Sequence, residues 1–250
     1  MMNAQPSPYG YRSGRLRAIA AMLLLGASAG MHLLWAILHA FMAGGVLGGP
    51  DAAASGEETL SVAEALNAVV LLLNFFIFAA AAVAFLLWLH RAYSNLRPLG
   101  ARQLNDTPGM AVGSFFIPIL NLFRPYKAVR EIWRWSKPVE DAGGVSAGLS
   151  FTVDTGAPLV GWWWGLWIIS SVASNLYYRL SDEEHATEAL PWLGLINDVM
   201  TIAAAAVAIL MIRSIDRMQE ERSKQLALGG TPFEQPPPPP NFGTVGQQQS

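Results

Sequence analysis

Long apolar stretches separated by polar segments dominate the hydrophobic pattern of this chain. Four of them lie at about residues 18–41, 64–90, 158–178 and 191–212. At a rise of about 1.5 Å per residue, a helix of about 20 residues crosses the roughly 30 Å hydrocarbon core of a bilayer. The pattern therefore predicts an all-α, polytopic membrane protein built on a four-helix transmembrane bundle.

Between the second and third stretches, a shorter apolar run covers residues 109–123. It is too short for an ordinary span and is interrupted by Pro118 and Asn121, so we expect a re-entrant segment that enters the membrane and returns. Non-helical backbone at that depth is tolerated only against protein. Four apolar side chains are therefore expected to pack on the bundle rather than face lipid: Phe115, Phe116, Ile117 and Leu120.

Residues 124–137 follow directly and have the pattern of an interfacial amphipathic helix. Helical periodicity puts Tyr126, Val129 and Ile132 on one apolar face and the basic side chains on the adjoining face. We expect the apolar face to seat at the acyl boundary and the basic face to bind anionic headgroups, at about 1 kcal/mol per basic residue. In the alternative, these basic residues bind no particular lipid and only keep the segment on the cytoplasmic side of the membrane. The predicted lipid-interface residues are Arg124, Lys127, Arg130, Arg134, Lys137 and Trp133.

The placement of lysine and arginine predicts the orientation. Fifteen of the 16 lie before the first span, between the second and third, or after the fourth, and Arg179 is the exception. Basic loops stay in the cytoplasm, so both termini and the central segment are predicted to be cytoplasmic. A fifth crossing through residues 109–123 would move the basic helix outside, and we reject it.

The two ends of the chain are too polar to order themselves by burial. The polar composition of residues 1–17 predicts a flexible cytoplasmic leader, and the membrane domain is expected over residues 18–224. Residues 225–250 include the run Pro236 to Pro240 and predict a disordered, proline-rich tail. A polyproline ligand for an aromatic groove is the alternative for this run.

Composition and motifs argue against several classes of function. The net charge of −2 lacks the basic excess of a nucleic-acid binder, and the absence of cysteine excludes thiolate chemistry. The chain has no phosphate-binding glycine loop and no Gly-x-Ser-x-Gly turn. His32 and His39 share a helix face but lie about 10 Å apart along the axis, which disfavours a shared metal site. We therefore expect no enzyme, no cofactor and no metal.

Polar residues inside the predicted spans are the remaining candidates for a site. An ionisable group in hydrocarbon costs on the order of 3 kcal/mol, and Asp198 is the one carboxylate deep in a span. His32, Asn74 and Asp198 fall at matching depth on three spans. We predict that they form an intramembrane cluster, which either fixes helix register or serves proton-linked transport or ligand binding.

Three motifs follow one another as WLHRAYSNL, PGMAVGSFFIPILNLFRPYKAVREIWR and GWWWGLWIIS. Over roughly residues 88–170 they resemble an uncharacterised bacterial membrane-protein family, domain of unknown function 4328. The resemblance implies a multi-span membrane protein of undetermined function and supplies no catalytic residues. We expect the protein to lie in the bacterial inner membrane as a multi-pass protein.

We predict that the protein is a non-enzymatic membrane scaffold or sensor with a basic cytoplasmic interfacial helix. The alternative is a small transporter or channel that uses the cluster around Asp198. The expected partners are membrane lipids with anionic headgroups, and a membrane protein or second copy of this chain. Nucleic acid is not expected as a partner.

Overall fold

The computed structural model describes residues 10–44, 57–138, 157–181 and 190–228, which form helices joined by loops. The all-α prediction is confirmed for these residues. The elements are α1 (Arg15–Ala43), α2 (Glu57–Ser94), α3 (Pro108–Gly113), the 3-10 turn η2 (Ser114–Phe116), α4 (Pro118–Asn121), α5 (Arg124–Ser136), α6 (Ala157–Leu180) and α7 (Leu190–Leu228).

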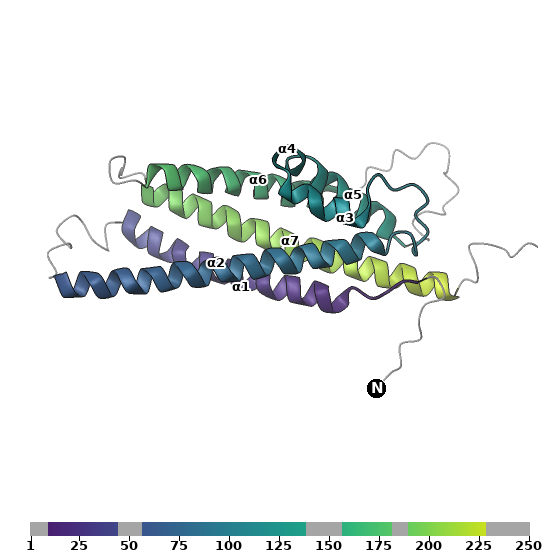
Figure 1. The fold of residues 1–250 in the computed structure, drawn as a ribbon, viewed down its shortest axis with the longest axis horizontal. Coiled ribbons are helices and arrows are strands. Elements are labelled where there is room, and N and C mark those ends of the chain that lie inside the picture. The colour runs from purple at the N-terminus through teal and green to yellow at the C-terminus, as the bar shows by residue number, and fades with distance from the viewer. Residues whose placement is uncertain (1–9, 45–56, 139–156, 182–189, 229–250) are drawn as a thin grey trace, which may run out of the picture.

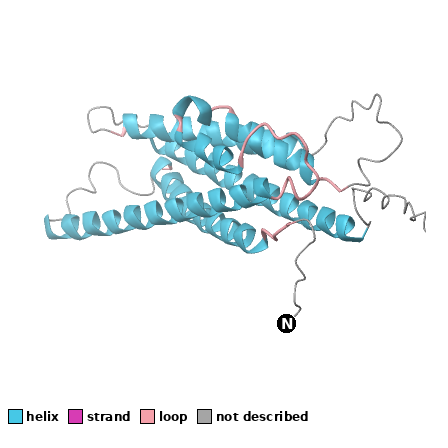
Figure 2. Ribbon diagram, turned by 45° about the vertical axis from the view of Figure 1, so that its right-hand side comes forward, coloured by secondary structure: helices cyan, strands magenta, loops and turns pink. Residues whose placement is uncertain are grey.

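The four long helices lie side by side and alternate in direction (Figure 1). Helix α1 packs along both α2 and α7, and α7 also packs along α6. One end of the bundle holds the start of α1, the end of α2 and the short helices α3 to α5, and we call it the α5 end. Helix α1 ends and α7 begins at the opposite, far end, and Figure 2 shows the same arrangement from a second angle.

Three helices are long and apolar enough to cross a membrane: α1, residues Ala68–Ser94 of α2, and α7. On length and composition, the structure therefore supports three of the four predicted spans, and α6 is the exception. Helix α6 is long enough at 24 residues, but its tryptophan, serine and tyrosine side chains lower its mean hydropathy. Only 17% of the most apolar stretch of α1, and likewise of α2, is buried within the protein, so these helices need a lipid environment.

Two helices extend into segments that the sequence assigns to the ends of the chain. Helix α1 begins at Arg15, inside the predicted leader, and α7 continues to Leu228, past the predicted start of the tail. The preceding residues are also held in place, because Asn95 Nδ2 donates to the Arg12 carbonyl at 3.0 Å. The remaining leader and tail predictions concern residues 1–9 and 229–250, which lie outside the described residues.

The run of residues 109–123 forms short helical turns instead of a non-helical dip. Pro108 and Pro118 begin α3 and α4, at first-turn positions where the missing N–H costs nothing. None of these elements has the length of a span. The central segment therefore does not form a fifth crossing helix.

The side chains of this run do not all pack as expected. Phe115 lies against Phe85 with ring centroids 6.0 Å apart, and Leu120 is partly buried. Phe116 and Ile117, in contrast, are 72% and 44% exposed, so the prediction that they pack on the bundle is wrong. Helical turns pair much of their backbone internally, which removes the need for a protein cover over these side chains.

The hydrophobic core is concentrated at the α5 end, where the long helices meet α5. Trp88, Tyr93 and Ile132 are at most 1% exposed there. Phe85 of α2 also reaches Trp163 of α6, with ring centroids 5.6 Å apart. Burying a large apolar side chain contributes about 1.5–3 kcal/mol, so this end anchors the fold.

Candidate functional site

A buried carboxylate joins α1 to α7 within the apolar part of the bundle. Asp198 of α7 is 3% exposed, and each of its two oxygens accepts a hydrogen bond from a different histidine of α1. His32 Nδ1 donates to Asp198 Oδ1 and His39 Nδ1 donates to Asp198 Oδ2, both at 2.8 Å. The arrangement pairs both carboxylate oxygens away from water, where an unpaired carboxylate is costly.

The spacing of the two histidines explains how one side chain can serve both. His32 and His39 are separated by about two helical turns and therefore lie on the same face of α1. Their backbone positions lie about 10 Å apart along the axis, but both Nδ1 atoms reach the same carboxylate, one to each oxygen. The structure brings the predicted His32 to Asp198 and adds His39, which the sequence prediction did not include.

Helix α6 contributes a further polar group to this His–Asp–His link. The Tyr177 hydroxyl donates to His39 Nε2 at 3.3 Å, and the two rings meet edge to face with centroids 5.7 Å apart. On the other side, Trp35 stacks against His39 at 6.0 Å. A chain of hydrogen-bonding groups thus runs from α6 through α1 to Asp198 of α7.

Gly194 makes room for the His39 ring. It precedes Asp198 by one turn of α7, and a Cβ atom built there would lie 2.8 Å from His39 Cε1 and Nε2. Real Cβ contacts are not this short, so any larger residue would push the ring away. The Gly194–Asp198 pair at i, i+4, facing two histidines at i, i+7, is the signal in the sequence that could have revealed the complete link.

Asn74 is the predicted member that the structure does not bring into the link. Its Oδ1 is buried and has no hydrogen-bond partner among the described residues. Matching depth along the bilayer does not determine which helix faces which, and this explains the difference. A different asparagine, Asn197, which precedes Asp198 in the sequence, connects α7 to α6, because Ser174 Oγ donates to Asn197 Oδ1 at 2.9 Å.

The predicted lipid-interface residues divide into two groups on α5. Lys127, Arg130 and Arg134 are exposed on its outer face. Arg124 forms an ion pair with Asp106 at 3.1 Å, and Lys137 is partly buried. Only the first group therefore presents fully exposed charge.

Trp133 requires a correction, because it is 7% exposed and belongs to the hydrophobic core. Val129 and Ile132 of the same face are fully buried. The apolar face of α5 packs on the bundle, where it is protected by protein rather than by acyl chains. The amphipathic pattern predicts a helix with one apolar face, and the partner of that face is the protein rather than lipid.

A second buried polar network, which sequence reasoning did not identify, lies at the α5 end. Glu131 of α5 accepts a hydrogen bond from the Tyr93 hydroxyl, and its other oxygen accepts from Asn105 N and Nδ2 at 3.0 and 2.9 Å. The Tyr93 oxygen in turn accepts from Asp106 N at 3.0 Å. Glu131 thus holds the loop after α2 against α5, although the sequence presents it only as one acidic residue in a basic helix.

Gln219 connects the same end to α7. Its Nε2 donates to the Ala92 carbonyl at 2.9 Å and to Ser136 Oγ at 3.1 Å, so it joins α7 to α2 and α5. Arg222, one turn further, donates to the carbonyls of Leu99 and Lys137 at 2.8 and 2.6 Å. We call these contacts, together with those of Glu131, the α5-end network.

Within the described part of the chain, no group of three histidine, cysteine or acidic residues is arranged to hold a metal ion. The family model described as Domain of unknown function (DUF4328) matches residues 51–219, about two thirds of the chain. This range includes Tyr177, Gly194 and Asp198 but begins after α1, which carries both histidines. No curated protein and no solved structure is significantly similar to this chain.

Proposed function

We propose that this chain, which belongs to the DUF4328 family, is a non-enzymatic integral membrane scaffold or sensor. The observation that supports it is the buried link from His32 and His39 to Asp198. It ties the first crossing helix to the last at a position where water is scarce. Buried polar contacts between crossing helices fix their register, so such a link suits a scaffold, or a sensor whose helix packing changes when the link is broken.

We further propose that α6 crosses the bilayer beside α7, so that four helices cross and the α5 end faces the cytoplasm of a bacterial cell. The support is the antiparallel packing of α6 along α7 and the concentration of basic residues at the α5 end. Reporter fusions after Gly56 and Glu188 are expected to report the outside, and those after Gly143 and Gln225 the cytoplasm. A cytoplasmic reporter after Glu188 would contradict this topology.

A small proton-linked transporter is the second candidate, and Tyr177 favours it. Its hydroxyl extends the link into a chain of four titratable groups from three helices, which is the composition of a proton relay. The two functions differ in what Asp198→Asn does to purified protein in sealed vesicles. A scaffold or sensor loses stability and shows no proton-dependent flux before or after the substitution, whereas a transporter shows a flux that the substitution abolishes.

The exposed charges of α5 are proposed to contact anionic lipid headgroups at the cytoplasmic surface. Lys127, Arg130 and Arg134 support this, since each basic residue near such a surface is worth about 1 kcal/mol. Replacing all three by glutamate in the full chain is expected to weaken its preference for anionic over neutral lipid. An unchanged preference would leave these charges with a role in topology alone.

A further inference from the structure

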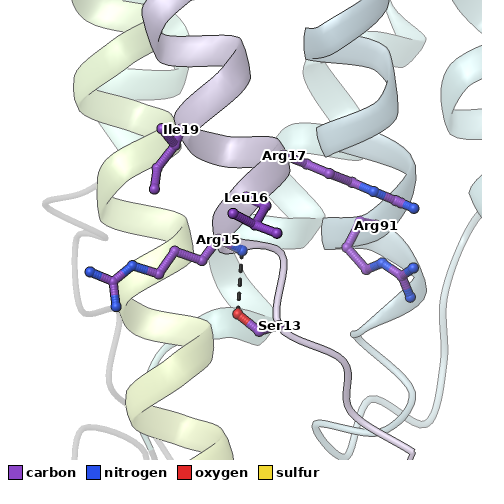
Figure 3. A pocket seen from close by; sticks show the side chains of 6 residues that line it. All are labelled: Ser13, Arg15, Leu16, Arg17, Ile19 and Arg91. Atoms are coloured by element: carbon purple, nitrogen blue, oxygen red, sulfur yellow. Dashed lines mark hydrogen bonds between the residues drawn. The ribbon is translucent and has the colours of Figure 1, made fainter. Parts of the chain in front are cut away.

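An open cavity lies at the α5 end between the start of α1 and the end of α2 (Figure 3). Its volume of about 510 Å³ is within the roughly 300–1,000 Å³ of small-molecule sites. It is separate from the His–Asp–His link, and none of its lining residues belongs to α5. The lining residues are Ser13, Arg15, Leu16, Arg17, Ile19 and Arg91.

Three arginine side chains bring positive charge to this cavity, and one carboxylate reaches its lining, because Ser13 Oγ donates to Glu220 Oε1 at 2.7 Å. Figure 3 shows Arg17 and Arg91 extending to the same side, while Arg15 points toward α7. Neither Arg17 nor Arg91 forms an ion pair with any described residue. Arg12 and Arg17 also lie near enough to Arg91 to repel its positive charge. An anion placed between these side chains would relieve that repulsion.

The guanidinium groups retain the donors that an anion needs. Arg17 Nη1 lies 3.5 Å from the Leu87 carbonyl oxygen, at the outer limit of hydrogen bonding. An arginine carries five N–H donors in a planar fork that matches the oxygens of a phosphate group. Arg15 differs, because the nearby Asp216 of α7 partly compensates its charge. Arg17 and Arg91 therefore keep most of their donors for an anion.

The cavity also has an apolar rim, which indicates the kind of anion. Leu16 is 84% exposed and Ile19 is 39% exposed, although both lie on the helix that enters the membrane from this point. Exposed leucine and isoleucine beside arginine side chains suit the boundary between headgroups and acyl chains. A soluble phosphate would make no use of this rim.

On the premise of the cytoplasmic orientation proposed above, we propose that this cavity binds an anionic phospholipid of the cytoplasmic leaflet. Arg17 and Arg91 hold the phosphate, and Leu16 and Ile19 contact the start of the acyl chains. The site attaches the first two crossing helices to one class of lipid. It is independent of the exposed charges on α5.

Native mass spectrometry of the full chain in detergent, with added phosphatidylglycerol or phosphatidylcholine, tests the site. The unaltered protein is expected to retain phosphatidylglycerol preferentially. Arg17→Gln with Arg91→Gln is expected to lower its binding on the order of tenfold. The matched control, Arg97→Gln with Arg213→Gln, removes the same charge from exposed positions outside the cavity and is expected to change binding less than twofold.

A second variant guards against misfolding of the first. Leu16→Glu changes a side chain that is 84% exposed, so the core is spared, and it places a carboxylate beside the two guanidinium groups. We expect it to lower phosphatidylglycerol binding as strongly as the double substitution.

Equal retention of the two lipids, or an equal loss in the control, would overturn the proposed site. Displacement of the lipid by an equal concentration of glycerol phosphate would overturn the lipid assignment in favour of a soluble phosphate. These measurements are made in detergent, so they remain decisive if the reporter fusions reverse the topology. A reversed topology would overturn the leaflet and the proposed orientation, but not the binding itself.

Discussion

Two buried polar regions of the described structure pair their carboxylates away from water with different kinds of hydrogen-bonding partner. In the His–Asp–His link, a carboxylate is paired with two histidines across the interface of α1 and α7. In the α5-end network, Glu131 is paired with a tyrosine hydroxyl and with amide groups, and Gln219 bonds to a carbonyl and a hydroxyl. Amides and carbonyls keep the same hydrogen-bonding capacity across the physiological pH range, whereas histidines change theirs.

The difference teaches where rigidity and responsiveness reside in the fold. The α5-end network lies beside the hydrophobic core and joins α2, α5 and α7, which suits a fixed platform. The His–Asp–His link lies where α1 and α7 are otherwise apolar. If its hydrogen bonds were lost, few other polar contacts would hold α1 against α7. A scaffold needs the first region, and a sensor needs both.

The largest expected effect comes from removing the carboxylate of the link. Asp198→Ala leaves two histidines without their acceptor in an apolar surrounding, and we expect a loss of about 3 kcal/mol in unfolding free energy. Asp198→Asn keeps one acceptor and is expected to cost about half as much. Unfolding in a denaturing detergent measures both, with Val199→Ala, an exposed neighbour, as the control. A smaller loss for alanine than for asparagine would mean that the link does not stabilise the bundle.

Removing the corresponding carboxylate of the α5-end network tests whether the two regions contribute equally to the free energy of unfolding. Glu131→Ala leaves the Tyr93 hydroxyl and two Asn105 donors unpaired, for an expected loss of about 2 kcal/mol. The exposed Arg130→Ala on the same helix is the control and is expected to change little. Protease accessibility of the loop after α2 should rise with the loss of stability. A stable variant with an unchanged loop would remove Glu131 from the platform.

Adding a single methyl group at Gly194 tests how closely His39 packs against α7. Gly194→Ala places a Cβ atom 2.8 Å from the ring, so we expect the ring to move and stability to fall by about 1–2 kcal/mol. Gly165→Ala on α6 meets nothing within 4 Å and is expected to be neutral or slightly stabilising. Equal behaviour of the two variants in the same unfolding assay would show that His39 does not need this close approach.

The smallest effect concerns the pH dependence of the α5 end itself. Burial, and then the charge of Glu220, raises the pKa of Asp216 above its ordinary value, although Arg15 lowers it in part. Asp216 lies beyond the crossing part of α7, about 39 Å along the helix from Leu190. A carboxyl whose pKa is raised by folding stabilises the fold below its ordinary pKa and loses this contribution as pH rises through the raised value.

Asp216→Asn is therefore expected to raise stability at neutral pH by less than about 1 kcal/mol, since solvent screens a half-buried group. At a pH below the ordinary carboxyl pKa the gain should vanish. Unfolding at both pH values measures it, with Glu221→Gln as a control that removes an exposed helical ion pair instead. A gain that persists at low pH would assign the effect to packing rather than to ionisation.

The sequence by itself predicted the long helices, α5 and their approximate ends. Apolar length and helical periodicity are local properties, so they predicted α1, α2 and α7 as crossing helices and the one-sided pattern of α5. The cost of a carboxylate in hydrocarbon also indicated that Asp198 must have a partner, and His32 at matching depth is one.

Only the tertiary structure decided which neighbours meet. Rotation of a helix about its axis and the choice of adjacent helix depend on packing, not on depth, and so Asn74 remains outside the link while His39 enters it. The missing Cβ of Gly194 sets the approach of α1 to α7 there. For the same reason Trp133 and Glu131 face protein, although the sequence alone favours lipid and solvent for an amphipathic, basic helix.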